Sequence, residues 1–228
     1  MIVMTRVPRL GRGKTRLRRV LSDDARARLQ EAFLRDTVEV ALEADIGPVY
    51  LAYTPPEDAA RIESQFGSCT IPVPQRGDSL GARMVAVLRY VAARRHTPLI
   101  MVGTDTPLLQ PQHLRMALLA AQRDDVCLGP SADGGYYLVA CRAVISRLFD
   151  GVPWGTDSVL QRTQRLAAEA GLRHSLLEPL YDIDTPEDLI SLRRDLWRLS
   201  GDPSFRMPKH TFEALFSRAG SLREEVAI

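Results

Sequence analysis

Apolar residues along the chain fall into two repeating patterns. Short, nearly continuous apolar runs are typical of strands buried on both faces, and longer segments with apolar residues at helical spacing are typical of helices. The runs that predict strands are residues 1–4, 48–53, 70–73, 99–102, 126–129, 136–141 and 174–177. The segments that predict helices are residues 22–44, 80–91, 114–121, 156–170 and 186–199.

This alternation predicts an α/β fold, a three-layer sandwich in which a mostly parallel central sheet has helices on both faces. No internal repeat or low-complexity linker divides residues 1–200, so we expect them to form one domain. Beyond them, Gly201, Pro203 and Pro208 interrupt the chain before a short amphipathic segment around Phe212. Residues 201–228 are expected to be a C-terminal appendage. It docks on its parent domain, docks on a second copy in a homodimer, or frays, and the sequence leaves these alternatives open.

Composition and charge indicate that the binding partners are small molecules. Of 228 residues, 45% are hydrophobic, which is ordinary for a globular domain with a sizeable core. The net charge of +2 is too small for a general nucleic-acid surface, and no polybasic tail points to a membrane. The three cysteines form no CxxC pair, and basic residues follow the short apolar start, in the wrong order for a secretion signal. We therefore expect a cytoplasmic protein.

Asp105 lies in a Gly-Thr-Asp-Thr segment between the apolar run 99–102 and Pro107. In open α/β sheets ligands bind at the carboxyl ends of the strands, which is where this segment emerges. Proline cannot continue a strand ladder, so the chain turns and Asp105 faces the crevice. We interpret Asp105 as a ligand of a metal that holds a phosphate ester. The alternative is that it only caps the helix that follows.

A basic, glycine-containing loop follows the first predicted strand. Gly11 and Gly13 let backbone N–H groups approach an anion, and the cationic side chains around them complement phosphate oxygens. The loop and the residues after it contain Arg6, Arg9, Arg12, Lys14, Arg16, Arg18 and Arg19. The pattern Gly13-Lys14-Thr15 does not complete a Walker A motif, because position 8 is proline. The loop is interpreted as a triphosphate cradle, and the alternative is a solvated basic loop.

Two further clusters have the composition of ligand-binding turns. Arg83 lies in the first turns of the helix that Asp78 or Ser79 caps, where it reaches a phosphate or a base edge or is an ordinary surface residue. Asp133 precedes the pair Gly134-Gly135, which suits a backbone that passes close to a bound molecule. A tight hairpin with an Asp-Gly turn explains the same residues without a ligand.

The last cluster starts the helix that follows residue 185. Thr185 as N-cap and Pro186 at the first helical position explain the helix start by local chemistry. Asp182 and Asp184 are not needed for capping, and they lie on the same side of an extended segment, away from Ile183. One of them is expected to meet Asp105 across a divalent cation, for which Mg²⁺ or Mn²⁺ fits the carboxylate oxygens.

With these clusters in this order, the chain resembles the nucleotide-diphospho-sugar transferase superfamily with the glycosyltransferase-A fold. More narrowly it resembles the bacterial radical-SAM/selenodomain-associated transferases, which are described as arsenosugar-biosynthesis-glycosyltransferase-like. It is more distantly similar to molybdenum-cofactor and 2-phospholactate guanylyltransferases. The segments that carry the resemblance are PRLGRGKTRL, LRDT, GDSLGARM, VGTDTPLL, LGPSADGGYYLV, WGTDSVL and DIDTPEDL, within about residues 1–195. The chain departs from the family at Arg6, where lysine is usual.

The resemblance implies roles for individual residues. Lys14 and Arg16 would hold nucleotide phosphates, and Asp105 and Asp184 would bind the metal. Asp133, with its two glycines, would shape an acceptor pocket. The implied reaction is nucleotidyl transfer from a nucleoside triphosphate to a small phosphorylated or acidic acceptor, with release of pyrophosphate. The alternatives are glycosyl transfer from a nucleotide sugar and nucleotide binding without catalysis.

Overall fold

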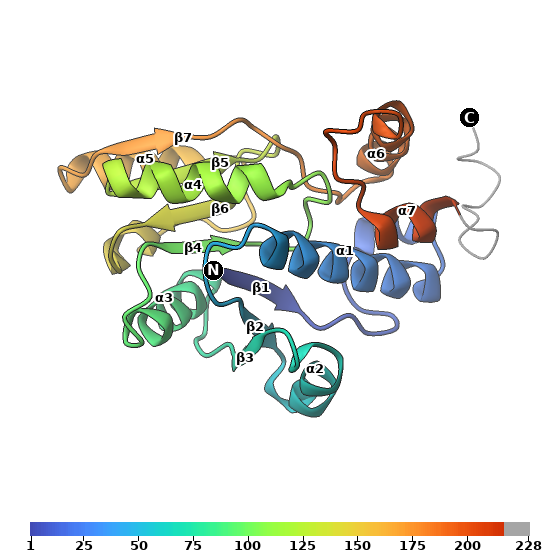
Figure 1. Cartoon of the computed structure of the whole chain (residues 1–228), viewed down its shortest axis with the longest axis horizontal. Helices are drawn as coiled ribbons and strands as arrows, with labels where there is room; N and C mark the ends of the chain where they lie inside the picture. Colours follow the sequence, from blue (N-terminus) through green and yellow to red (C-terminus); the bar gives the residue numbers. More distant parts are fainter. Residues whose placement is uncertain (217–228) are drawn as a thin grey trace.

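The computed structural model describes residues 1–216, and residues 217–228 lie outside the described part of the chain. A seven-stranded sheet in the order β3-β2-β1-β4-β6-β5-β7 forms the centre of the molecule (Figure 1). Its strands are β1 (Ile2–Arg6), β2 (Tyr50–Thr54), β3 (Ile71–Pro74), β4 (Leu99–Val102), β5 (Val126–Pro130), β6 (Tyr136–Cys141) and β7 (His174–Leu176). Only β6 runs antiparallel to its neighbours in this sheet, which confirms the mostly parallel sheet.

Helices cover both faces of the sheet, as predicted. The α-helices are α1 (Asp23–Glu43), α2 (Ala59–Phe66), α3 (Leu80–Ala92), α4 (Pro111–Arg123), α5 (Val159–Glu169), α6 (Pro186–Leu199) and α7 (Lys209–Phe216). Short 3₁₀ turns occur at η1 (Thr15–Arg19), η2 (Pro56–Asp58) and η3 (Ser146–Phe149). One apolar core packs α1, α2 and α4 on one face, and a second core packs α3 and α5 on the other.

The prediction from the sequence missed α2. Only Ile62 and Phe66 of this helix are buried, so its apolar face is too short to give a clear helical period. The other helices and all strands lie close to their predicted positions. Their starts follow local capping: the Ser22 and Ser79 hydroxyls each accept an N–H at 3.1 Å, and Thr185 and Asp188 form a capping box.

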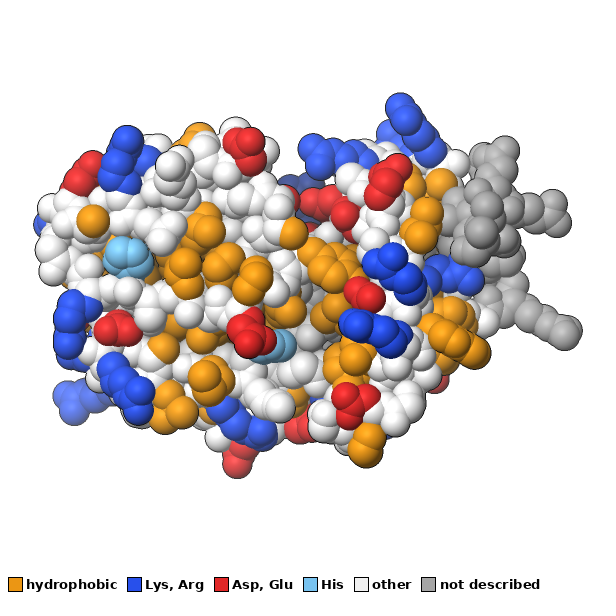
Figure 2. Space-filling model, turned by 90° about the horizontal axis from the view of Figure 1, so that it is seen from above, with side chains coloured by type: hydrophobic (Ala, Val, Ile, Leu, Met, Phe, Trp, Pro, Cys, Tyr) orange, Lys and Arg blue, Asp and Glu red, His pale blue; other side chains and the backbone are white. Residues whose placement is uncertain are grey.

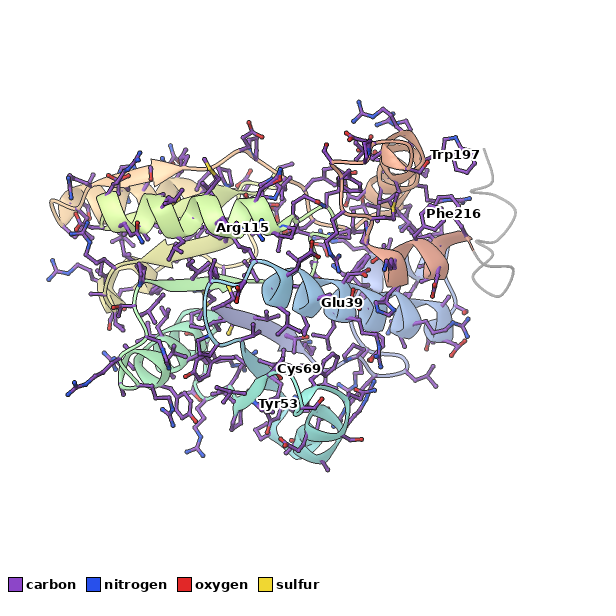
Figure 3. All side chains as sticks on the ribbon, in the orientation of Figure 1. Glu39, Tyr53, Cys69, Arg115, Trp197 and Phe216 are labelled. Atoms are coloured by element: carbon purple, nitrogen blue, oxygen red, sulfur yellow. The ribbon has the colours of Figure 1, made fainter. Side chains whose placement is uncertain are left out.

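Residues 201–216 pack against the preceding chain. Leu215 of α7 joins an apolar cluster with Phe33 of α1 and Leu196 of α6. Trp197 of α6 and Phe216 of α7 lie beside one another (Figure 3), with ring centroids 6.5 Å apart. The described part of the appendage therefore docks on its own chain. Within residues 1–216, no helix combines the length and the apolar composition that a bilayer crossing requires.

Candidate active site

The order of the strands places a crevice at the carboxyl ends of β1 and β4. The chain moves from β1 outward to β2 and β3, and then returns to the other side of β1 to form β4. Such a change of direction leaves a gap above the two strands, because their connections run to opposite faces. Residues 7–14 leave β1 there, residues 103–106 leave β4, and the turn that opens antiparallel β6 reaches the same edge.

Lys14 lies at the centre of this edge, between two carboxylates. Its Nζ is 3.0 Å from Oδ1 of Asp105 and 2.9 Å from Oδ1 of Asp184. Only 4% of the Lys14 side chain is exposed, whereas about half of each aspartate side chain is open to solvent. Burial alone disfavours the ammonium, but attraction by the two aspartates outweighs it and raises the pKa of Lys14.

A backbone contact explains why residues so distant in sequence meet. The N–H of Ile183 donates to the carbonyl of Asp105 at 2.9 Å, which ties the segment before α6 to the loop after β4. The Ile183 side chain is fully buried, so its neighbours Asp182 and Asp184 lie on the opposite side of the segment. The structure thus brings Asp105 and Asp184 to one ammonium. That they hold a metal remains a prediction.

Asp182 is a further acidic group of the site, placed behind the other two. Its Oδ1 accepts a hydrogen bond from the Thr106 hydroxyl. Burial, with added repulsion from Asp105 and Asp133, raises the pKa of Asp182 from 3.8 to about 6, although the Thr106 bond opposes the shift. Figure 2 shows acidic side chains in the furrow beside the part of the molecule that α6 forms.

The basic loop takes a conformation that requires its glycines. Gly11 and Gly13 have φ values of +72° and +68°, and Lys14 itself is left-handed at φ 42°. A Cβ on Gly13 would lie 2.0 Å from the Gln30 side chain. Arg16, one turn further on in η1, is exposed. The loop therefore packs closely on α1, and the Lys14 side chain enters the crevice from it.

Arg83 lies in a separate basic pocket on the β2 side of the loop. Its Nε donates to the Gly77 carbonyl at 2.9 Å, which fixes the side chain across the start of α3. The pocket has a volume of about 280 Å³. Its lining is Arg6, Val7, Arg9, Arg12, Thr54, Pro55, Glu57 and Arg83. Four guanidinium groups around one opening suit an anionic ligand.

The turn at Asp133 is explained in part by the chain's own packing. Oδ1 of Asp133 accepts the N–H of Gly135 at 2.9 Å, as in a tight turn. Gly134 has φ +85°, and a Cβ on it would lie 2.1 Å from the Asp157 carbonyl oxygen. Gly134 is thus required by its contact with the segment before α5, whereas the carboxylate of exposed Asp133 is near enough to Asp182 to raise its pKa.

An apolar cavity that the sequence did not predict is lined in part by Gly103, two residues before Asp105. Its volume is about 130 Å³. The lining is Met4, Leu80, Met84, Met101, Val102, Gly103, Tyr136, Tyr137, Val139 and Trp154. These residues come from five separate segments, so no local pattern could join them. Gly81, at the start of α3, allows close packing beside this cavity: a Cβ there would lie 2.9 Å from the Phe149 carbonyl oxygen.

One other group in residues 1–216 has the composition of a metal site, namely Asp36, Glu39 and His210. The atoms that could bind a metal already have partners within the protein. Asp36 accepts the N–H groups of His210 and Thr211, and Glu39 pairs with the His210 ring at 2.9 Å and with Arg206 at 2.7 Å. Figure 3 shows Glu39 on α1 beside α7. This cluster holds the appendage on α1.

Comparison with known proteins places the chain in a family. Residues 37–156 match the model of a family described as an uncharacterized protein conserved in bacteria (DUF2064). The chain belongs to the DUF2064 family. It is also 30% identical over 190 residues to 3-phospho-D-glycerate guanylyltransferase of Phenylobacterium zucineum, covering 79% of this chain and 84% of that protein. Phosphoenolpyruvate guanylyltransferase of Geodermatophilus obscurus is 32% identical, with 82% and 85% covered.

Solved structures agree with this assignment. A crystal structure assigned to a nucleotide-diphospho-sugar transferase from Desulfovibrio desulfuricans G20 has a TM-score of 0.83 at 27% identity, covering 92% of this chain and 91% of that one. A nucleotidyl transferase from Methanothermobacter thermautotrophicus shares the fold, with a TM-score of 0.53 at 18% identity and 87% and 98% covered. This DUF2064 protein is therefore an enzyme, a transferase, with the expected superfamily fold.

Proposed function

We propose that this DUF2064 protein transfers a nucleotidyl group, with guanylyl as the first choice, from a nucleoside triphosphate to a small phosphorylated acid. The observation that carries the proposal is the meeting of Lys14 with Asp105 and Asp184 at the switch point of the sheet. Relatives whose names specify guanylyl transfer to 3-phosphoglycerate or phosphoenolpyruvate support the choice of nucleotide and acceptor.

The donor set at the carboxylates fits a divalent cation. Asp105 and Asp184 each direct an oxygen at the same ammonium, so their shared space favours positive charge, and carboxylate oxygens are ligands that suit Mg²⁺. Mg²⁺ or Mn²⁺ would be held by these two residues. When bound, such an ion supplies positive charge that stabilises the charge developing on the phosphates.

The chain's own residues would bind and orient the two substrates. Lys14 and Arg16, with the N–H groups of the loop, would neutralise the phosphates of the nucleotide. An oxygen of the ionised acceptor then forms a bond to the α-phosphorus while the bond from that phosphorus to the bridging oxygen breaks, and pyrophosphate leaves with that oxygen. Because the acceptor oxygen is already ionised, no side-chain nucleophile is required. Asp133 would border the acceptor.

Glycosyl transfer from a nucleotide sugar is the second candidate. The high structural similarity to the protein assigned as a nucleotide-diphospho-sugar transferase favours it. The cationic loop favours the first candidate, because a triphosphate carries more negative charge close to Lys14 than a nucleotide sugar does.

The two candidates differ in their products. We would incubate the chain and Mn²⁺ or Mg²⁺ with each nucleoside triphosphate, using 3-phosphoglycerate and phosphoenolpyruvate as acceptors, and measure pyrophosphate. We expect metal-dependent pyrophosphate release that is fastest with GTP. Turnover of nucleotide sugars without pyrophosphate would favour the glycosyl reaction, and nucleotide binding without any turnover would contradict both.

A matched pair of variants tests the role of the carboxylates. Asp105→Asn keeps the shape of the side chain but removes its charge, so we expect kcat/KM to fall by roughly a hundredfold or more. Asp150→Asn makes the same change on an exposed residue and should leave the rate at the wild-type value. Full metal-dependent activity in Asp105→Asn would refute the assignment.

A further inference from the structure

The basic loop is held by its carbonyl oxygens. The Gly11 carbonyl accepts from Nη2 of Arg18 at 3.1 Å, and the Arg12 carbonyl accepts from Nε2 of Gln30 at 3.1 Å. The Gly13 carbonyl accepts from Nη1 of Arg26. Consecutive carbonyls thus point into the protein, toward α1 and its neighbour η1.

The N–H groups on the other side of these peptide planes are free. In a trans peptide the C=O of one residue and the N–H of the next point in opposite directions. Gln30 binds the Arg12 carbonyl, so the N–H of Gly13 points away from α1. Arg26 binds the Gly13 carbonyl, so the N–H of Lys14 also points away from α1. Within residues 1–216, these two N–H groups donate to no backbone oxygen. Successive free N–H groups in a turn of the backbone form a concave anion site.

The side chains that hold the loop are placed by the helix period. Arg26 and Gln30 are four residues apart on α1, so they lie on the same face. Arg26 is fully buried and pairs with Asp23, one turn before it. Nε2 of Gln30 also donates to the Arg26 carbonyl at 3.1 Å. Figure 1 shows that the loop after β1 leads to the start of α1, and that α1 then runs back alongside β1.

We propose that Arg26 and Gln30 are positioning residues for phosphate binding: by holding the carbonyls of Gly13 and Arg12, they aim the N–H groups of Lys14 and Gly13 at the phosphates. The proposal rests on the nucleotidyl-transfer function proposed above. Neither side chain needs to touch the nucleotide. Gln30 is the cleaner test, because it is only half-buried and methionine can replace it at similar size.

The experiment measures binding of inorganic tripolyphosphate, with Mg²⁺, by calorimetry, together with steady-state kinetics. Gln30→Met removes the donor, so we expect tripolyphosphate to bind roughly three- to tenfold more weakly, as the loss of a positioning hydrogen bond implies. The KM for the nucleoside triphosphate should rise by a similar factor, whereas the KM for the acceptor stays constant. Gln122→Met, on the exposed side of α4, is the control and should bind as wild type does.

A second pair of variants separates positioning from folding. Arg26→Lys can still donate to the Gly13 carbonyl and should bind tripolyphosphate more tightly than Arg26→Met does, although both lose the Asp23 pair geometry. If Gln30→Met and both Arg26 variants bind tripolyphosphate like wild type, the positioning role is overturned while the nucleotide site stands. If wild type itself binds neither tripolyphosphate nor a nucleoside triphosphate, the proposed function fails and the positioning role fails with it.

Discussion

At the scale of single residues, the site concentrates charge of both signs where the sheet opens. Lys14 is nearly inaccessible and remains charged because Asp105 and Asp184 both attract its ammonium. Asp182 lies near them and is pushed toward its neutral form, since burial and its acidic neighbours favour the protonated carboxyl. The two shifts belong to one arrangement, in which two carboxylates pair with one buried cation and a third carboxylate is buried near them.

The raised pKa of Asp182 predicts a pH dependence of stability. The folded protein holds this proton up to about pH 6, whereas an unfolded chain releases it near pH 3.8. The contribution of Asp182 is therefore most favourable below about pH 4, falls as the pH rises to about 6, and is constant above that, with a total change on the order of 3 kcal/mol.

Asp182→Asn should remove this dependence, because the amide oxygen still accepts from Thr106 and carries no charge. Urea unfolding from pH 4 to pH 7 would measure it. Relative to wild type, the variant should gain stability steadily between pH 4 and pH 6. Asp150→Asn should run parallel to wild type throughout. Parallel curves for wild type and Asp182→Asn would show that the carboxyl titrates normally.

At the scale of elements, the site is assembled from turns that contact each other rather than from one motif. The turn before β6 lies against the start of α5 and the segment before it: the Gly134 carbonyl accepts the N–H of Leu160 at 2.9 Å, and its Cα faces the Asp157 carbonyl. In the same way α3 approaches Phe149 through Gly81. Glycine at these positions serves packing between elements, which in turn shapes the cavity.

Gly134→Ala should therefore cost more stability than its backbone angle alone implies. Gly155 provides the control, because its φ of +83° nearly equals the +85° of Gly134 and a Cβ there would meet nothing within 4 Å. We expect Gly155→Ala to cost about 1 kcal/mol and Gly134→Ala about 2–3 kcal/mol more, since the turn must shift away from Asp157. Equal urea midpoints for the two variants would refute the packing role of Gly134.

At the scale of the whole molecule, α1 links the active-site edge to the C-terminal appendage. One end of the helix holds the basic loop through Arg26 and Gln30, and Asp36, further along, receives α7. The Asp36 carboxylate accepts two backbone N–H groups from the first turn of α7, at 3.1 and 2.7 Å. A side chain from one helix thus caps another that lies far away in sequence.

Loss of this cap should loosen the appendage. We expect Asp36→Ala to lower the free energy of unfolding by about 1–2 kcal/mol, because two buried N–H groups lose their acceptor. Asp36→Asn keeps an acceptor oxygen and should recover part of that loss. Urea unfolding followed by tryptophan fluorescence would report it, since Trp197 contacts Phe216 of α7. An alanine variant as stable as wild type would mean that the apolar cluster alone holds α7.

The sequence by itself determined the strands and all helices except α2, because period, caps and turn residues act over a few neighbouring positions. It thus predicted α6 from its capping box and the same-side placement of Asp182 and Asp184. It also indicated that Asp105 ends a buried strand. Only the tertiary structure decided which aspartate meets Lys14, that Gly134 and Gly81 serve packing, and that a cavity opens beside Trp154. These features depend on contacts between segments distant in sequence, and no local pattern encodes the distance between them.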